Sequence, residues 1–284
     1  MRFSEDRIEK LTCSDGIQRD IHIWEPDQPR AVCLIIHGLM DHGGSYLLPA
    51  LFFKKHLLAT VAYDQHGHDR KRKAHCPRFE VLLDDLDLMI GWVKENYMGL
   101  PIIIMGHSMG GLIITHYGLW RLEEDLLIKG FVVSSPYYMN AVKVPWILQK
   151  LAVALSTILP KMTAPIEDIF PYVTRDQEIY NRHREDIRDQ IKADKVSVRL
   201  GNELLRAQSL IPDKISEWSH PLLAINAGDD KIADVKVARQ LLEQINPALV
   251  TELFYPENFH ENFNEPNRDE IFKKIVEWTL PRIS

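Results

Sequence analysis

The fold of this chain is decided by the stretch Ile102-Ile103-Ile104-Met105-Gly106-His107-Ser108-Met109-Gly110-Gly111. Its four leading apolar residues predict a buried strand, and the apolar residues after it predict the start of a helix. Between them lies the pattern Gly-x-Ser-x-Gly, in which a sharp strand-to-helix turn exposes a serine hydroxyl above the sheet. The pattern alone arises by chance in about one chain in ten, so the strand and the helix around it carry the prediction. We expect Ser108 to be a nucleophile, the alternative being a glycine-rich turn with an incidental serine.

Short apolar runs alternate with longer amphipathic segments on both sides of this turn. We expect strands at 31–36, 60–63, 101–105, 130–133, 221–226 and 250–255, and helices at 80–96, 108–121, 234–244 and 268–278. This alternation indicates crossover connections and a mostly parallel sheet. Because the strands are continuously apolar, helices should cover both faces of the sheet. The expected fold class is therefore α/β.

The segment 136–219 interrupts the alternation. Residues 144–159 are apolar almost all round, whereas residues 176–194 are charged and follow a helical pattern. We predict that 136–219 is an inserted helical cap, and that residues 1–135 and 220–284 form the core.

Composition narrows the class of protein. The chain has 284 residues, of which 45% are hydrophobic and 26% charged, and a net charge of −6. The sequence has no basic stripe of the kind that would predict a nucleic-acid partner. The basic run at 70–73 is interpreted as a solvated loop, with a phosphate or anionic-lipid contact as the alternative. Three cysteines, no signal peptide and no apolar stretch of the ~20 residues that span a bilayer favour a cytoplasmic location.

Partners for the serine are expected after two late strands, because the order along the chain in this type of site is Ser, acid, His. His260, the last histidine of the chain, follows the strand at 250–255. It would take the proton of Ser108 and return it to the leaving group. Asp229, Asp230 and Asp234 all follow the strand at 221–226, and the residues alone leave the choice of acid open.

An oxyanion hole needs two backbone N–H donors. The residue after the nucleophile, Met109, supplies one donor, and the loop after the first apolar strand supplies the other. In that loop, His37-Gly38-Leu39, we expect the donor to be Leu39.

Five of the histidines in the first third of the chain form a candidate cluster, namely His37, His42, His66, His68 and His75. The segment His66-Gly67-His68-Asp69 invites comparison with a metal site. The pattern His-x-His-x-Asp-His would need an aspartate at position 70, which is Arg70 here. We therefore predict no metal, and hydrogen bonds among these histidines instead.

Taken together, these motifs resemble those of the monoacylglycerol lipase and lysophospholipase branch of the α/β hydrolases, a serine aminopeptidase S33-type family, over most of the chain. Residues 37–46 are similar to the family's oxyanion loop and residues 106–111 to its nucleophile elbow. Residues 230–234 are similar to its acid motif, in which the first aspartate is catalytic. The resemblance thus favours Asp230, which lies 30 positions before His260 (260 − 230). It implies the α/β-hydrolase fold with an inserted helical cap.

The family resemblance also implies a way of binding substrate. An apolar cap helix would guide lipid from a membrane, with ordinary packing of residues 144–159 as the alternative. Polar groups would bind the glycerol end of the substrate, and the corresponding residues in this sequence are Asp41, His107 and Tyr180. Two departures weaken the head-group assignment. Ser45 stands where the family has arginine, and residues 64–68 replace Asp-x-Arg-Gly-His with Asp-Gln-His-Gly-His.

The predicted function is a serine carboxylic ester hydrolase that acts on single-acyl lipids, monoacylglycerol first, through an acyl-enzyme and without a cofactor. Lysophospholipase or general carboxylesterase activity is the alternative, and cap cations at Arg182, Arg184, Arg188 and Lys192 would favour a phosphate head group. A binding module without activity is a further alternative. The expected partners are a lipid ester and, through the cap, a membrane surface, while the oligomeric state is not predicted.

Overall fold

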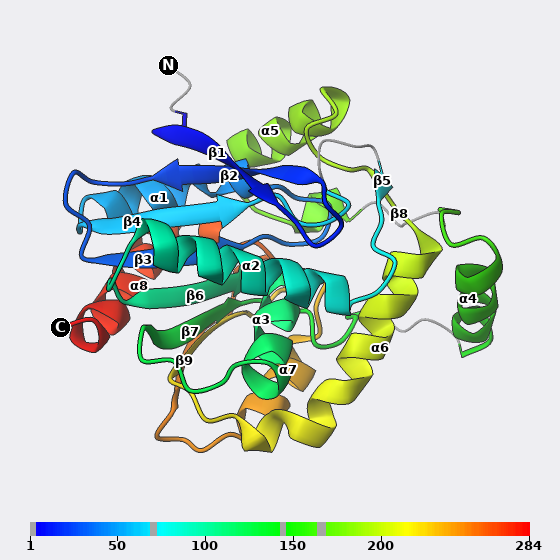
Figure 1. Ribbon diagram of the computed structural model, residues 1–284. Coiled ribbons are helices and arrows are strands. Elements are labelled where there is room, and N and C mark those ends of the chain that lie inside the picture. Colours follow the sequence, from blue (N-terminus) through cyan, green and yellow to red (C-terminus); the bar gives the residue numbers. More distant parts are fainter. Residues whose placement is uncertain (1–3, 69–72, 143–145, 164–168) are drawn as a thin grey trace.

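The structure is a computed structural model that describes residues 4–68, 73–142, 146–163 and 169–284. Within these residues, eight strands form one sheet in the order β1-β2-β4-β3-β6-β7-β9-β10 (Figure 1). Six of them are mutually parallel: β3 (Ala31–Ile36), β4 (Leu58–Tyr63), β6 (Ile102–His107), β7 (Ile128–Ser134), β9 (Leu222–Ala227) and β10 (Val250–Tyr255). The prediction of a mostly parallel sheet is confirmed.

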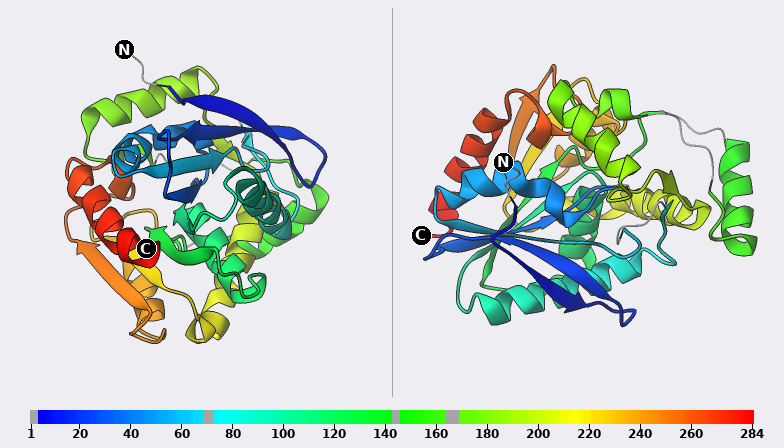
Figure 2. Two further views of the ribbon diagram at one scale, coloured as in Figure 1. Left: turned by 60° about the vertical axis from the view of Figure 1, so that its left-hand side comes forward. Right: turned by 90° about the horizontal axis from the view of Figure 1, so that it is seen from above.

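Helices cover both faces of the sheet (Figure 2). On one face pack α2 (Glu80–Asn96) and α3 (Met109–Trp120), and on the other pack α1 (Leu47–Lys54) and α8 (Arg268–Thr279). Within β3, Val32, Leu34 and Ile36 belong to the first core, whereas the residues between them belong to the second. Side chains alternate between faces in a strand, so a strand buried on both faces reads as one apolar run.

Two strands at the edge of the sheet were not predicted. β1 (Arg7–Thr12) pairs with β2 (Gln18–Trp24) in antiparallel fashion, and β2 continues antiparallel onto β4. Exposed polar side chains interrupt the apolar pattern of β1, namely those of Lys10 and Thr12. This half-solvated edge lacks the continuous apolar signal that identified the central strands.

The segment between β7 and β9 contains α4 (Trp146–Ile158), α5 (Gln177–Arg188) and α6 (Val198–Lys214). Buried residues of α6 such as Leu200, Leu204 and Ile211 join the core that α2 and α3 form. In the views of Figures 1 and 2, α4 projects from the body of the molecule and contacts α6. A short strand, β8 (Lys195–Val196), pairs with β5 (Lys73–Ala74). In the predicted cap, α6 therefore packs into the same hydrophobic core as α2 and α3.

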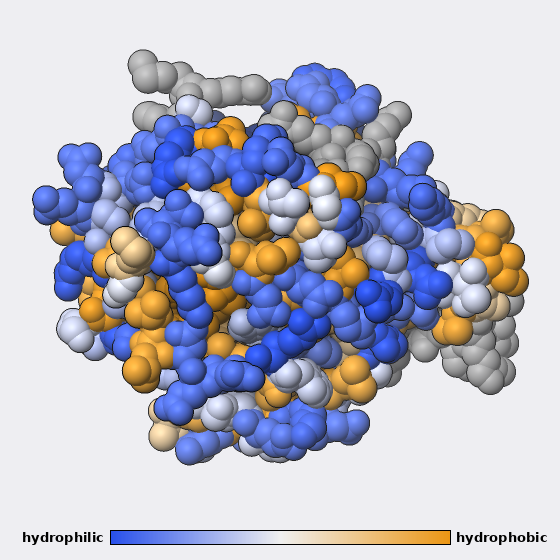
Figure 3. Space-filling model, in the orientation of Figure 1, coloured by the Kyte–Doolittle hydropathy of each residue, from blue (hydrophilic) through white to orange (hydrophobic). Residues whose placement is uncertain are grey.

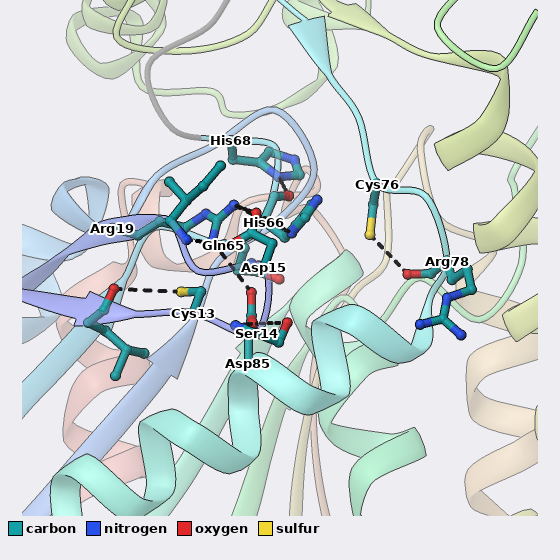
Figure 4. Close-up of polar contacts among 12 residues, drawn as sticks. Cys13, Ser14, Asp15, Arg19, Gln65, His66, His68, Cys76, Arg78 and Asp85 are labelled. Atoms are coloured by element: carbon teal, nitrogen blue, oxygen red, sulfur yellow. Dashed lines mark hydrogen bonds and ion pairs between the residues drawn. The ribbon is translucent and has the colours of Figure 1, made fainter.

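A buried carboxylate connects the β1–β2 turn to α2 (Figure 4). Asp85 is fully buried and accepts hydrogen bonds from the backbone N–H and the hydroxyl of Ser14, at 2.8 and 2.6 Å. Arg19 lies 3.9 Å from the second Asp85 oxygen and donates to both carboxylate oxygens of Asp15. The turn is thus held on the helix by polar contacts inside the protein.

Replacing Asp85 by alanine should destabilise the protein. Asp85→Ala removes the acceptor of both Ser14 donors and one of the two carboxylates that face the buried charge of Arg19, which costs about 3 kcal/mol. Urea unfolding followed by circular dichroism measures the free energy. The matched control is Asp87→Ala on the same helix, where an exposed ion pair with Arg121 is lost at a cost below about 1 kcal/mol. Equal losses for the two variants would contradict the role of Asp85.

Candidate active site

The turn between β6 and α3 holds Ser108 in a strained conformation. Its φ of +53° and ψ of −116° are unusual for a residue with a side chain. A Cβ atom on Gly106 would lie 2.4 Å from the Gly110 carbonyl oxygen, and one on Gly110 would lie 2.0 Å from the Ile36 oxygen. Both positions therefore exclude any side chain, as the Gly-x-Ser-x-Gly pattern requires.

The structure brings together three side chains that lie far apart in the sequence. The Ser108 hydroxyl lies 2.8 Å from Nε2 of His260, and Nδ1 of His260 lies 2.7 Å from Oδ2 of Asp230. Asp230 follows β9, and its Oδ1 accepts the N–H groups of Ile232 and Ala233 at 2.8 and 2.9 Å. These backbone bonds fix the direction of the carboxylate toward the imidazole.

The other two candidate acids have different partners. Asp229 forms an ion pair with Arg175 at 2.8 Å. Asp234 is the N-cap of α7 (Val235–Leu242) and accepts the N–H groups of the first turn of that helix. Of the three aspartates considered, Asp230 is the one whose carboxylate contacts His260.

Electrostatics prepares His260 to act as a base. Burial by itself lowers the pKa of His260, but the adjacent Asp230 carboxylate raises it to a net value above the usual one for histidine. Burial likewise raises the pKa of Asp230, while His260 and the backbone donors bring it below its ordinary value. Because a carboxylate only accepts hydrogen bonds, Nδ1 of His260 carries the proton and Nε2 is free to accept from Ser108.

The loop after β3 approaches the serine closely. A Cβ atom on Gly38 would lie 3.3 Å from the ring of His107 and 3.4 Å from Cβ of Ser108. Next to it is Leu39, the predicted oxyanion donor, while Met109 begins α3 and so has an N–H without an acceptor in the helix. The loop is fixed from behind, because Nε2 of His37 accepts the N–H of Gln65 at 3.0 Å. Both predicted donors therefore lie on the backbone segments that flank the Ser108 hydroxyl.

A pocket with mixed polar and apolar walls lies next to the site, lined by His107, which precedes Ser108, and by Glu261, which follows His260. Two of the three predicted substrate-binding residues line it, Asp41 and His107, and the others are Ser45, Tyr46, Pro49, Glu261, Phe263 and Asn264. Burial lowers the pKa of His107 to about 4, so this imidazole is neutral. The third predicted residue, Tyr180, lies on α5 and contacts Arg184; it is not among the described residues that line this pocket. Sequence analysis missed Glu261, whose only signal was its place next to His260.

One histidine cluster has the spacing of metal ligands. Among the described residues, His22, His42 and Asp64 could converge on an ion. Both ring nitrogens of His22 already face carboxylates, Glu5 at 2.7 Å and Asp64 at 3.2 Å. Burial opposes charge on His22, but these carboxylates raise its pKa to about 9. In this arrangement His22 forms a buried ion pair with the two carboxylates.

Hydrogen bonds were predicted among five histidines. Of these, His68 is buried and its ring contacts the backbone carbonyl of His66, whereas His37 contacts the Gly38 carbonyl and His75 the Ser197 hydroxyl.

Comparison with known proteins identifies relatives of the whole chain. The family model described as "Serine aminopeptidase, S33" matches residues 27–267. A monoacylglycerol lipase of Mycolicibacterium smegmatis is 26% identical over 94% of this chain and 95% of its own length. Phospholipase YtpA of Bacillus subtilis is 29% identical over 90% of this chain and 97% of its own length. An uncharacterized abhydrolase domain-containing protein of Dictyostelium discoideum is 28% identical over 97% of this chain, which spans only 29% of that protein.

Solved structures share the fold. A soluble variant of monoglyceride lipase from Saccharomyces cerevisiae, in complex with a substrate analog, superimposes with a TM-score of 0.85. The match covers 100% of this chain and 97% of that chain at 18% identity. At this identity the similarity concerns the fold, and it confirms the predicted fold class.

The pH dependence of serine reactivity tests the assignment of the acid. A protonated His260 cannot accept the Ser108 proton, so labelling by a fluorophosphonate should rise with pH through a midpoint above about 6.5. In Asp230→Asn, burial is no longer opposed, so the pKa of His260 falls and the midpoint moves to lower pH. The labelling rate at high pH should also drop about a thousandfold, because the imidazole loses its correct tautomer.

Asp229→Asn is the matched control for this experiment and should keep the wild-type midpoint. A wild-type midpoint in Asp230→Asn, or a shifted midpoint in Asp229→Asn, would exclude Asp230 as the partner of His260.

Proposed function

The chain belongs to the α/β-hydrolase family described as serine aminopeptidase S33, and from this premise we propose that it hydrolyses the ester bond of single-acyl lipids, monoacylglycerols first. The observation that carries the proposal is the hydrogen-bonded series Ser108–His260–Asp230 next to a pocket with both polar and apolar walls. The relatives described as monoacylglycerol lipases support the choice of substrate.

In the first half of the proposed reaction, Ser108 becomes acylated. His260 takes the proton from the Ser108 hydroxyl as its oxygen attacks the ester carbonyl. The N–H groups of Leu39 and Met109 would donate to the oxyanion that forms. His260 then protonates the departing alcohol, which leaves an acyl-enzyme.

In the second half, water takes the place of the alcohol. His260 deprotonates this water as it attacks the acyl-enzyme, and the fatty acid leaves with Ser108 regenerated. Asp230 stabilises the imidazolium in both halves, since its buried carboxylate lies 2.7 Å from Nδ1. The reaction needs no cofactor.

The charge of the pocket supports a neutral head group. Asp41 and Glu261 both line it, and each carboxylate has a pKa below its ordinary value because neighbouring cations and hydrogen bonds outweigh burial. Carboxylates accept hydrogen bonds from the hydroxyl groups of a glycerol moiety. Because Asp41 is paired with Lys192, the charge left to repel a phosphate is that of Glu261, and this wall favours a monoacylglycerol over a lysophospholipid.

Lysophospholipid hydrolysis is the second candidate, because a phospholipase is among the relatives. Arg184 and Arg188 of α5 are exposed and could face an anionic head group. Lys192, expected among these entrance cations, is instead buried and paired with Asp41. The structure thus corrects its assignment and leaves fewer cations for a phosphate.

We propose that α4 is a membrane-contacting surface. At its C-terminal end, Val153, Ile158 and Leu159 are 52%, 74% and 50% exposed, and Met162 follows at 38%. Figure 3 shows apolar surface on the lobe that α4 forms. Residues 144 and 145 of the predicted apolar segment lie outside the described residues. None of the helices in the described ranges has the length and apolar character that crossing a bilayer requires.

Fatty-acid release from a long-chain monoacylglycerol tests the reaction and the lipid class together. Wild type should release fatty acid, and Ser108→Ala should lose more than about a thousandfold in rate because no acyl-enzyme forms. Ser209→Ala, which truncates an exposed serine of α6, is the matched control and should behave as wild type. If the wild type releases no fatty acid from this substrate but cleaves a short ester in a Ser108-dependent way, the hydrolase assignment stands and the lipase assignment is excluded.

The head group is tested at one acyl length by comparing a monoacylglycerol, a lysophosphatidylcholine and a p-nitrophenyl ester. We expect kcat/KM to be higher for the monoacylglycerol than for the lysophospholipid. The reverse order would favour the second candidate.

Membrane contact is tested by sedimentation with phosphatidylcholine vesicles. The double variant Ile158→Asp/Leu159→Asp should bind at least about tenfold less, because it removes two exposed apolar side chains whose burial each contributes about 2 kcal/mol. Leu126→Asp is the control, since Leu126 is 78% exposed but lies between α3 and β7. Unchanged binding of the double variant would exclude this surface.

A further inference from the structure

A lysine of the predicted cap is buried against the oxyanion loop. The side chain of Lys192 is only 5% exposed, and its ammonium lies 2.7 Å from Oδ1 of Asp41 and 2.8 Å from Nδ1 of His183. An ammonium group only donates hydrogen bonds, so Nδ1 of His183 must accept. This contact assigns the tautomer of His183, whose proton is then on Nε2.

The second nitrogen of His183 extends the chain of contacts. Its Nε2–H donates to Glu261 at 2.7 Å, and the side-chain amide of Asn264 donates to the same carboxylate oxygen at 2.7 Å. Four side chains thus form one series, Asp41–Lys192–His183–Glu261. We refer to these four residues as the cap bridge.

The cap bridge ends on the two loops that carry the reacting groups. Asp41 lies two positions after Leu39, the proposed oxyanion donor, and Glu261 follows His260 directly. Both Asp41 and Glu261 line the pocket beside Ser108. The two middle members, His183 and Lys192, belong to the cap segment, so the cap connects the two loops through side chains.

Backbone contacts hold the same cap segment against the loop that follows β10 and carries His260, which we call the histidine loop. The N–H of Glu261 donates to the Val173 carbonyl at 2.8 Å, and the N–H of Arg175 donates to the Glu265 carboxylate at 2.8 Å. These contacts fix the start of α5 on one loop. For the oxyanion loop, the corresponding contact is the ion pair between Lys192 and Asp41.

Charge makes this contact specific. Burial would raise the pKa of Asp41 and of Glu261. Lys192 lowers the pKa of Asp41, and His183, with a smaller contribution from Lys192, lowers that of Glu261 to about 2. Removing one partner of a buried ion pair leaves the other charge uncompensated, which is far more disruptive than losing an exposed pair. Without Lys192, the Asp41 carboxylate would have to turn toward water and take its loop with it.

We propose that Lys192 and His183 are positioning residues of the hydrolytic reaction, which hold the oxyanion loop and the histidine loop at the spacing that catalysis requires. The inference rests on the proposed ester hydrolysis and deepens it. Neither residue touches the reacting atoms. Their effect should therefore appear in the rate of the chemical step, for every ester, whatever its head group.

The test is Lys192→Met, which keeps the length of the side chain and removes its charge. Two esters of one acyl length are compared, a monoacylglycerol and a p-nitrophenyl ester. We expect kcat for both to fall about tenfold, since small displacements of catalytic groups have effects of this size or larger, with KM within about twofold of wild type. The matched control is Lys195→Met, an exposed lysine three positions along, which should leave both constants unchanged.

A double-mutant cycle with Asp41→Asn, measured on the p-nitrophenyl ester, tests the link between the two residues. This ester has no glycerol group, so any binding role of Asp41 is silent. If Lys192 acts through Asp41, the double variant should be no slower than Lys192→Met alone. Losses that multiply would overturn the link, as would a wild-type kcat for folded Lys192→Met or a loss confined to KM.

Folding of each variant is verified by circular dichroism and thermal unfolding before kinetics. If Lys192→Met does not fold, His183→Leu tests the next contact of the cap bridge with the same expected fall in kcat. Failure of the proposed lipid specificity is distinguishable, because the wild type would then be silent on the monoacylglycerol while the p-nitrophenyl ester still reports on Lys192.

Discussion

Ser108 and the two side chains bonded to it in series are placed relative to one crowded point, where the first turn of α3 passes over the ends of β3 and β6. A side chain on Gly110 would collide with the Ile36 carbonyl, and one on Gly106 with Gly110 itself. This approach leaves Ser108 a backbone conformation that is unfavourable for a residue with a side chain. The packing of both sheet faces compensates for that strain, because neither strand can retreat from the helix without opening the core. The serine hydroxyl is therefore held above the sheet before any substrate binds.

The strand order then determines how far the other groups must reach. Ser108 follows β6, whereas Asp230 and His260 follow β9 and β10, on the far side of β7. The histidine loop must cross back over two strands, and a buried asparagine supports it. Asn262 is fully buried and donates to the Ser135 hydroxyl at 3.0 Å and to the Ile225 carbonyl at 3.4 Å. Polar contacts with the ends of β7 and β9 thus hold His260 over a strand to which it is not adjacent.

Sequence predicted what depends on local pattern and missed what depends on distant pairing. The parallel strands and the helices at 80–96 and 268–278 follow from apolar periodicity, and the serine turn from glycine spacing. The choice among Asp229, Asp230 and Asp234 depends on backbone bonds to Ile232 and Ala233, which no residue pattern displays, and the family resemblance favoured Asp230. Lys192 was assigned to the surface from its charge, although its partner Asp41 lies 151 positions away (192 − 41). The β1–β2 edge was missed because β1 is partly exposed to solvent and so lacks a continuous apolar run.

The predicted cap segment contacts the pocket through the buried charge of Lys192. From the sequence, Lys192 was placed at the surface because the partner that buries this charge is distant along the chain. Apolar packing of α6 on the core brings the segment back to the sheet but accepts many small shifts, because apolar contacts are not directional. A buried ammonium is stable in only a few positions, since it must lie within hydrogen-bond distance of oxygen or nitrogen acceptors. Asp41 and His183 provide these acceptors from two different parts of the chain. In the proposed arrangement, this buried charge fixes the segment against the oxyanion loop, as the bonds of Val173 and Arg175 fix it against the loop after β10.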